Sequence, residues 1–415
     1  MRTPTFRHLL PSVCACTLAF LLAGCGPSTP NTGDSVTIGL LLPFTGADSA
    51  TTSNFERAAL FAAARVNEGG GIGGKRLRIV SEDTHSEVAA SRRSAQRLID
   101  AGAKVVVGAE SAVIGPEIYP LLLNNQVALL SPLVGAAEEP NFDCTVPWFR
   151  LAPSAKSMGE ALAKTMLANG ITDVAILSAS DAYNEALSRA TRERFISLGG
   201  HVSLDLKIAP GAQSYASEAK AASAAHVSAV VLATSARAGA LVVNDFHAVL
   251  PGSVNWFLSP LLKTELLIAN VAPGALDGAR GVAPKIYETT SGFPAAFAAS
   301  WQGDQPLEGA YFFYDAIALL AFAMENAAAA DSTGGASAAG GLSRLVSSIR
   351  SSAAPTGEGR GWDEVESGLE RIRNGDLIYY TGLTGPMLLT DCGSRKFGRS
   401  TPFEVENGQI VDVSE

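Results

Sequence analysis

The chain alternates, from Ser35 onward, between short runs of apolar residues and longer segments with helical spacing. Strands that are apolar throughout, each followed by a helix, are typical of a parallel sheet that is covered on both faces. The pattern therefore predicts a doubly wound α/β lobe in the first part of the chain. The predicted strands are 36–42, 77–82, 105–107 and 127–130, and the predicted helices are 55–67, 87–101 and 116–124.

The same alternation starts again after residues 150–154 and predicts a second α/β lobe. Short strand-like runs return near the C-terminus, which indicates that the two lobes are not simply sequential. The second set of predicted helices is 155–169, 184–198, 215–225 and 238–249, with strands at 173–177, 201–207, 229–233, 255–258, 377–380, 385–389 and 403–413.

Two segments between these elements are unusual in composition. Residues 310–330 approach a membrane-spanning length, but Asp315 and Glu325 within the run favour a buried helix of a folded domain. Residues 327–341 are rich in Ala, Gly and Ser, and together with 351–361 they predict a mobile surface excursion over 327–361. The alternative is a loop that binds a partner protein.

The N-terminus has the organisation of an export signal. Arg2 and Arg7 precede an apolar run that closes on Leu22-Ala23-Gly24-Cys25, which resembles the lipobox of bacterial lipoproteins. We expect residues 1–24 to be a lipoprotein signal peptide, Cys25 to carry lipid, and residues 25–34 to be a tether. The alternative is an ordinary secretory signal that happens to end in Cys.

Charge and cysteine content narrow the function further. Without Arg2 and Arg7, 29 basic residues stand against 40 acidic ones, a formal charge of −11, and no basic stripe supports nucleic-acid binding. The cysteines left after Cys25 are Cys144 and Cys392, an even pair in an oxidising compartment. We predict a disulfide between them; two buried free thiols are the alternative.

No motif nominates an enzyme, a cofactor or a metal. Residues 69–74 satisfy the dinucleotide pattern G-x-G-x-x-G, but they leave a helix and enter a strand, which is the wrong order for that fingerprint. The five histidines have no metal-ligand spacing, and no nucleophile elbow or phosphate-binding loop occurs. The sequence favours binding without chemistry.

Several short motifs, taken in order, resemble one family. They are similar to those of the type I periplasmic binding proteins, specifically the leucine/isoleucine/valine-binding substrate-binding proteins of branched-chain amino-acid ABC transporters. The motifs lie at 38–46, 67–75, 96–99, 107–108, 130–132, 149–150, 180–183, 310–316 and 382–386.

The resemblance implies an α/β fold of two doubly wound parallel-sheet lobes, joined by three hinge crossovers, which close over a ligand. One lobe would comprise residues 35–150 plus 282–374. The other would comprise 151–281 plus 375–415. On this layout Cys144 would lie near the first crossover and Cys392 just past the third.

The ligand of such a fold is expected at the carboxyl ends of the strands of both lobes. A hydroxyl in these loops can equally be a helix cap, so each Ser or Thr has two interpretations. Tyr183 is the strongest candidate, because an aromatic ring with a polar tip suits a closing lobe. The predicted ligand-binding residues are Thr51, Glu110, Ser111, Ala112, Ser131, Leu133, Gly135, Asp181, Tyr183, Ser235 and Leu261.

The chain departs from the family at the amino-acid pocket. The family typically shows a hydroxyl where this chain has Ala112, a Thr where it has Gly135, and an acidic residue near Leu261. A buried ammonium without a carboxylate partner is costly. Either Glu110 or Asp181 takes that role, or the ligand is not an α-amino acid; with a small shift of the alignment, Glu265 also comes within reach.

These features predict an extracytoplasmic solute-binding lipoprotein of an ABC importer, located on the periplasmic or cell-surface face of a bacterial membrane. Its partners would be a small polar or amphipathic ligand, permease subunits, and the membrane through Cys25, with no cofactor and no nucleic acid. The alternative function is a sensor or interaction lipoprotein that uses the same fold without transport.

Overall fold

The computed structural model describes residues 35–46, 48–109, 114–135, 148–209, 211–250, 254–286, 292–332, 341–396 and 398–413. Residues Ser35–Glu415 form one compact unit with their own hydrophobic cores. The predicted signal peptide, Cys25 and its tether lie outside the described residues, as do Glu110, Ser111, Ala112 and Cys144.

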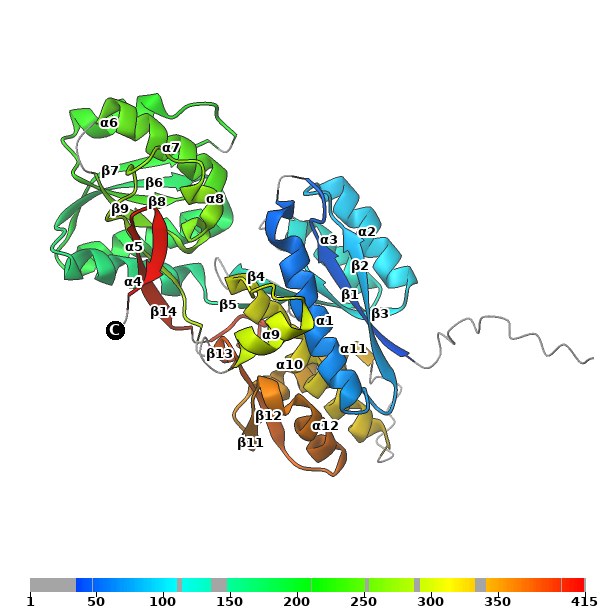
Figure 1. Cartoon of the computed structure of the whole chain (residues 1–415). Helices are drawn as coiled ribbons and strands as arrows, with labels where there is room; N and C mark the ends of the chain where they lie inside the picture. The colour runs from blue at the N-terminus through cyan, green and yellow to red at the C-terminus, as the bar shows by residue number, and fades with distance from the viewer. Residues whose placement is uncertain are drawn as a thin grey trace, which may run out of the picture. The chain divides into compact units, whose positions relative to one another are not determined.

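The first lobe is built on a five-stranded, fully parallel sheet with the order β2-β1-β3-β4-β5 (Figure 1). Alternate residues of β1 enter different cores: Ile38 and Leu40 pack with α1 and α10, whereas Leu41 packs with α2 and α3. The sheet is therefore covered on both faces, as its continuous apolar strands predicted. The strands are β1 (Ser35–Leu42), β2 (Arg76–Asp83), β3 (Ala103–Gly108), β4 (Ala128–Gly135) and β5 (Phe149–Ala152), and the helices are α1 (Thr52–Glu68), α2 (Val88–Asp100), α3 (Ile114–Asn124), α9 (Phe293–Ser300), α10 (Glu308–Ser332), α11 (Gly341–Ala353) and α12 (Val365–Arg373).

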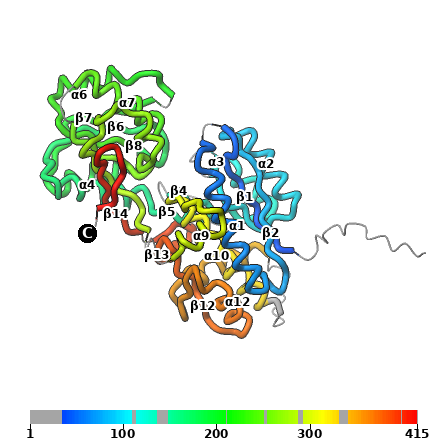
Figure 2. Tube along the Cα trace, in the orientation of Figure 1, coloured from blue at the N-terminus to red at the C-terminus, as the bar shows by residue number. Residues whose placement is uncertain are grey.

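The second lobe has a seven-stranded sheet with the order β15-β14-β10-β9-β8-β6-β7. Its β7, β6, β8, β9 and β10 are parallel, and the hairpin of β14 and β15 adds two antiparallel strands at one edge. Figure 2 shows this C-terminal segment, in red, returning to the green elements of the second lobe. The strands are β6 (Asp173–Ala179), β7 (His201–Ile208), β8 (Ala229–Ala233), β9 (Asn255–Leu258), β10 (Arg280–Pro284), β14 (Ser400–Glu406) and β15 (Gln409–Asp412), and the helices are α4 (Ala155–Ala168), α5 (Ala182–Ser197), α6 (Ala216–Ala224), α7 (Ala236–Val249) and α8 (Glu265–Ile268).

The boundaries between the lobes differ from the expected ones. The second sheet includes β10, so the chain leaves this lobe after Pro284 rather than at Gly281. A small sheet of β11 (Glu358–Arg360), β12 (Ile378–Gly382) and β13 (Gly385–Pro386) packs with the first lobe, because Ile378, Tyr380, Leu383, Met387 and Leu389 belong to its core. The last crossover therefore follows Leu389 rather than Asn374. Both boundaries depend on packing between residues that are far apart in the sequence, and local composition does not reveal such contacts.

The predicted surface excursion over 327–361 is wrong for 327–332 and 341–353, which are helical, whereas 333–340 lies outside the described residues. Helix α10 continues to Ser332, and α11 begins at Gly341 and buries Leu345 and Ile349 in the core of the first lobe. Alanine has the highest intrinsic helix propensity, so an Ala-rich segment can extend a helix. Composition alone was misleading, whereas the spacing of the apolar residues in 342–349 is helical.

Helix α10 is a core helix, as predicted. Within the described residues, Glu308–Ala330 is the one helix long and apolar enough to span a membrane, with a mean hydropathy of 1.3. However, 78% of that window is buried inside the folded unit, against β-strands and helices of the first lobe. Its apolar character is explained by packing.

The glycine-rich turn at 69–74 holds a buried ion pair. Arg373 donates to the carbonyl oxygens of Gly69 and Gly71, both at 2.7 Å, and lies 3.3 Å from the carboxylate of Glu325. Glu325, which is 2% exposed, also accepts from the Gly73 N–H at 2.9 Å. A Cβ at Gly71 would lie 2.0 Å from the Lys75 carbonyl oxygen, so this close turn requires glycine. The turn is held by contacts with Arg373 and Glu325 of its own chain.

Replacing Arg373 by methionine is expected to lower the free energy of unfolding by about 2 kcal/mol, because Glu325 would remain buried without its cation. We discount the full cost of a broken buried pair because Arg373 is itself 31% exposed. Arg371→Met on the same helix is the matched control. Its partners Asp376 and Glu358 are half-exposed, so we expect a smaller loss than for Arg373→Met. Urea unfolding of both variants measures the difference, and equal losses would contradict the assignment.

Candidate functional site

The predicted ligand-binding residues of the described chain lie at the carboxyl ends of strands in both sheets. In doubly wound folds this edge is where loops present groups to a ligand. Thr51 lies in a short 3-10 helix after β1, whereas Asp181 and Tyr183 begin α5 after β6. The others are Ser131, Leu133 and Gly135 on β4, Ser235 after β8 and Leu261 after β9.

Ser131 has a structural role in this site. Its buried hydroxyl donates to the Gly108 carbonyl oxygen at 2.6 Å and accepts from the Trp148 indole nitrogen at 2.9 Å. The guanidinium of Arg150 lies 5.4 Å from the Trp148 ring centroid, in cation–π contact. Ser131 thus joins β3, β4 and the approach to the first crossover, and its one hydroxyl proton is already committed.

Gly135 and Tyr183, predicted from different lobes, are brought together. A Cβ at Gly135 would lie 2.2 Å from the Pro153 carbonyl oxygen and 3.1 Å from Cε2 of Tyr183. The first distance is far shorter than real Cβ contacts, so any side chain at position 135 requires the backbone to move. Position 135 therefore requires glycine, because the crossover and the Tyr183 ring occupy the space that a side chain would need.

Tyr183 keeps its hydroxyl available. The ring packs against the second-lobe core, and among the described residues the hydroxyl has no hydrogen-bond partner. Desolvation and the neighbouring charge of Asp181 raise the pKa of Tyr183 well above its ordinary value. The side chain therefore stays a neutral phenol at physiological pH and can donate a hydrogen bond to an acceptor on a ligand.

Asp181 is a helix cap, one of the two interpretations that apply to polar loop residues. One carboxylate oxygen accepts from the backbone N–H of Asn184 at 3.0 Å, and the other accepts from its side-chain nitrogen at 2.8 Å. The remaining lone pairs of the carboxylate can still accept from a ligand. The side-chain oxygen of the same Asn184 is buried and makes no hydrogen bond to any described residue.

Three further hydroxyls at this edge are not committed. Thr51 and Ser235 occupy the N-cap positions of α1 and α7, yet neither makes the side-chain cap bond. Ser259, which directly follows β9, is fully buried, and its hydroxyl has no hydrogen-bond partner in the part of the chain that the structure describes. Ser259 was not among the residues predicted from the sequence. A serine between a strand end and Pro260 was the available signal, and it is a weak one.

Two of the predicted ligand-binding residues, Leu133 and Leu261, are hydrophobic. Leu133 is partly buried against the first-lobe core, whereas Leu261 is 46% exposed. The carboxylate that the family shows near position 261 is absent there. Glu265 is exposed at the first position of α8, and the charged group nearest in sequence is instead Lys263.

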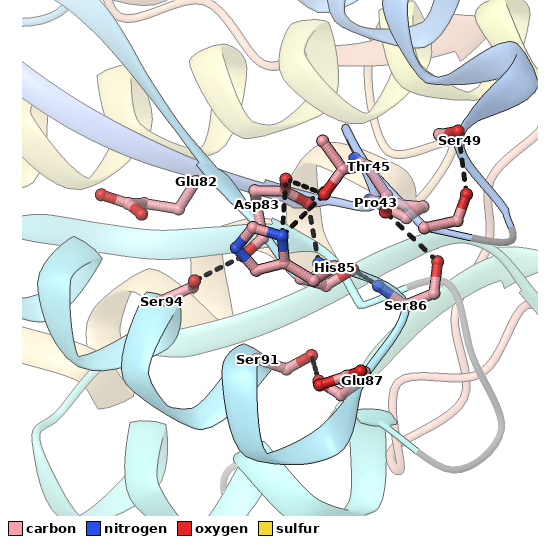
Figure 3. Close-up of polar contacts among 12 residues, drawn as sticks. Pro43, Thr45, Ser49, Glu82, Asp83, His85, Ser86, Glu87, Ser91 and Ser94 are labelled. Atoms are coloured by element: carbon pink, nitrogen blue, oxygen red, sulfur yellow. Dashed lines mark hydrogen bonds and ion pairs between the residues drawn. The ribbon is translucent and has the colours of Figure 1, made fainter.

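A polar cluster holds the loop after β1 against the loop after β2 (Figure 3). The Thr45 hydroxyl donates to Asp83 at 2.7 Å, and the Thr45 N–H donates to the other carboxylate oxygen at 3.2 Å. The pKa of Asp83 is lowered. Burial acts to raise it, but hydrogen bonds from Thr45 and from the His85 backbone, together with the charge of His85, outweigh that effect. The cluster fixes the loop that leads to Thr51. The sequence analysis did not single it out.

The cluster does not have the geometry of a catalytic triad. Nδ1 of His85 lies 2.6 Å from the Thr45 hydroxyl and 3.1 Å from the Asp83 carboxylate, so both groups face the same ring nitrogen. A general base needs the hydroxyl on one ring nitrogen and the carboxylate on the other. Over the described ranges, no group of three or more His, Cys, Asp or Glu side chains is arranged to hold a metal ion.

Cys392 is disulfide-bonded in the structure. Its predicted partner, Cys144, lies outside the described residues, so the pairing of these two cysteines stays a prediction. The chain next to Cys392 is tied to the first crossover, because Arg150 donates to the Gly393 carbonyl oxygen at 2.9 Å and to the Ser394 hydroxyl at 2.8 Å.

The two doubly wound lobes confirm the predicted fold class. Together with the polar groups at their strand ends, they place the chain among the two-lobed α/β binding proteins. A family model described as periplasmic binding protein matches residues 35–358. The chain therefore belongs to the periplasmic binding protein family. Among curated proteins, none matches this chain well enough to count as a relative.

Solved structures with the same fold cover most of the chain. A leucine-binding protein, LivK, from Thermotoga maritima has 18% identity and a TM-score of 0.73, covering 91% of this chain and 98% of its own. A branched-chain amino-acid substrate-binding protein, LivJ, from Streptococcus pneumoniae, in complex with isoleucine, has 15% identity and a TM-score of 0.71, covering 91% and 100%. An ABC-transporter solute-binding protein from R. palustris, in complex with benzoate, has 17% identity and a TM-score of 0.70, covering 91% and 95%. At these identities the likeness establishes the fold.

Proposed function

We propose that this protein is the extracytoplasmic solute-binding component of an ABC importer and binds a small carboxylate with an apolar body, such as a branched-chain amino acid or a related acid. The observation that carries the proposal is Tyr183: its ring lies beside Gly135, where two crossing segments of the site meet, and its neutral hydroxyl has no hydrogen-bond partner among the described residues. The fold and the family support binding rather than catalysis, and we assign the protein no catalytic step.

The ligand class follows from the groups at the strand ends. Tyr183, Ser235 and Thr51 offer hydroxyl donors, and the uncapped N-termini of α1 and α7 favour a negative charge. Leucine, isoleucine and benzoate, the molecules named with the three related structures, each carry a carboxylate on an apolar body. A ligand ammonium would use Asp181 or Glu110, the carboxylates that the sequence analysis named for it.

The location of the protein follows from the N-terminal motif. We infer that Cys25 carries the lipid, that residues 26–34 tether the folded unit, and that permease subunits receive the ligand. A Cys144–Cys392 disulfide fits the oxidising compartment of such a lipoprotein and would brace the first and third crossovers.

The first test is thermal unfolding of the protein from Gly26 onward, which retains the whole compact unit, against pairs of acids with and without an α-ammonium. Leucine with 4-methylpentanoate and phenylalanine with 3-phenylpropanoate are suitable pairs, and benzoate completes the panel. A ligand at a hundred times its Kd adds ~2.7 kcal/mol, which raises the midpoint by roughly a few degrees. A shift with both members of a pair shows that the ammonium has no partner; a shift with the amino acid alone assigns Asp181 or Glu110 to it.

Tyr183→Phe connects the shift to the site, because it removes only the hydroxyl. We expect about tenfold weaker binding, the equivalent of one hydrogen bond of about 1.4 kcal/mol. Tyr379→Phe is the control, on the half-buried β12 position of the small sheet. Failure of every carboxylate to shift a folded, ligand-free protein would contradict the proposed function, and unchanged binding by Tyr183→Phe would contradict the site.

A further inference from the structure

Lys263, in the loop after β9, makes two ion pairs at once. Its ammonium lies 2.7 Å from the carboxylate of Asp412 on β15 and 3.3 Å from that of Glu308 at the start of α10. The side chain is 14% exposed and lies 6.0 Å from the ring centroid of Phe403 on β14. A lysine this enclosed is uncommon unless it is paired.

The two partners of Lys263 belong to different lobes. Lys263 follows Leu262, which is part of the second-lobe core, and β15 with Asp412 is the edge strand of the second sheet. Helix α10, which Glu308 begins, is the central helix of the first-lobe core. The Lys263–Asp412 pair therefore lies within one lobe, whereas the Lys263–Glu308 pair joins the two.

Glu308 is fixed against the loop that the sequence analysis assigned to ligand binding. Its neighbour Gly309 lies against Phe55 of α1, where an added Cβ would be 2.4 Å from the ring. Asn54, two residues beyond the first residue of α1, accepts from the Leu307 N–H at 2.9 Å and donates to the Gln305 carbonyl oxygen at 2.8 Å. The position of Glu308 is thus coupled to the first turn of α1, directly after Thr51.

The energetics favour a conformational rather than a stabilising role for the pair. Burial acts to lower the pKa of Lys263, but the charges of Glu308 and Asp412 outweigh this effect and raise it. Burial raises the pKa of Glu308, and the attraction of Lys263 only partly offsets this effect; the Glu308 side chain remains 31% exposed. Pairs of this kind add little net stability. Moving the lobes apart would rehydrate both charges and leave the Lys263–Asp412 pair intact.

We propose that the Lys263–Glu308 pair is an ionic latch across the two lobes, which favours the lobe arrangement of this structure and ties it to the loop that carries Thr51. The latch acts in the protein without ligand, so it stands apart from the proposed function. The described residues offer a matched control in Asp412, which contacts the same ammonium from within the second lobe.

Inter-lobe distances measured by pulsed dipolar spectroscopy test the latch. Spin labels at Arg93→Cys on α2 and Lys220→Cys on α6 use exposed positions, one in each lobe, and the native disulfide of Cys392 leaves that cysteine unlabelled. In ligand-free protein we expect Glu308→Gln to lower the population at the main wild-type distance by at least about twofold. Lys263→Met should do the same, which covers the case in which one variant fails to fold. Asp412→Asn should leave the distribution unchanged.

Two results would overturn the latch. One is a Glu308→Gln distribution that superimposes on wild type, since the cross-lobe pair would then have no effect on the arrangement. The other is an Asp412→Asn distribution altered as much as that of Glu308→Gln, since the effect would then come from the placement of Lys263 and not from the bond between lobes. Ligand binding enters neither result, so failure of the proposed function and failure of the latch are distinguishable.

Discussion

Replacing Asp315 by alanine is expected to lower the free energy of unfolding by about 3–5 kcal/mol, the range for removing one member of a buried charged network. Asp315 is fully buried on α10 and accepts four hydrogen bonds. The donors are the Tyr380 hydroxyl at 2.7 Å, the Leu383 and Thr384 N–H groups at 2.8 Å, and the Thr384 hydroxyl at 2.8 Å. Without the carboxylate, all four donors lose their acceptor.

The loss should extend beyond the first lobe, because the network continues to a crossover. Arg395 donates to the Thr384 hydroxyl, to the Thr384 carbonyl oxygen, and at 3.2 Å to the Leu151 carbonyl oxygen. Thr384 therefore lies between Asp315 and a guanidinium that bridges the first and third crossovers. Gly382 packs directly against this network, since a Cβ there would lie 2.7 Å from the Asp315 carboxylate.

Tyr380→Phe measures how much one of the four hydrogen bonds to Asp315 contributes to stability. It removes one of the four donors and leaves the carboxylate in place, so we expect a loss of about 1 kcal/mol. Burial raises the pKa of Asp315 against the opposing hydrogen bonds, which indicates that the bonds only partly offset the desolvation of the charge. Urea unfolding at pH 7 with a common slope is the measurement. Equal losses for the two variants would show that the Tyr380 bond alone accounts for the effect and that the remaining network contributes nothing.

The two-lobed architecture was predictable because it depends on a local pattern, the alternation of apolar strands and helices along the chain. Most of the parallel strands are largely apolar and are followed by a helix, so two lobes could be inferred without contacts. The boundaries were not predictable to the same degree: β12 joins the first lobe through the packing of Tyr380 and Leu383, partners that are far away in sequence. The Ala-rich segment was misjudged because composition was given more weight than the helical spacing of Leu342, Leu345 and Ile349.

The loops that form the site were predictable from the sequence, but the role of each polar residue in those loops was not. Asp181 is a helix cap and the Ser131 hydroxyl joins strands, and neither role can be separated from ligand binding by residue type alone. The unpaired hydroxyl of Ser259 and the pair between Lys263 and Glu308 depend on distances across the fold. The absence of a side chain at Gly135, by contrast, was visible in the sequence, and the structure supplies its physical cause.

That cause makes Gly135→Ala the variant with the largest expected effect on binding. The new Cβ would lie 2.2 Å from the Pro153 carbonyl oxygen, a backbone atom at the first crossover, and 3.1 Å from the Tyr183 ring. Relieving the first contact requires movement of the backbone, at about 1–3 kcal/mol for an overpacked site. Because Tyr183 moves with it, we expect ligand affinity to fall by at least about tenfold, well beyond what the loss of stability explains.

Gly341→Ala is the matched control, because its Cβ would meet nothing within 4 Å at the first position of α11. We expect it to be neutral or slightly stabilising, since alanine is favoured over glycine in a helix. Thermal unfolding and titration with the ligand class found for the wild type measure both variants. If Gly135→Ala retained wild-type stability and affinity, the strand end, the crossover and Tyr183 would not form the close contact on which the site depends. If it lost stability alone, the contact would be structural and the ligand would bind without Tyr183.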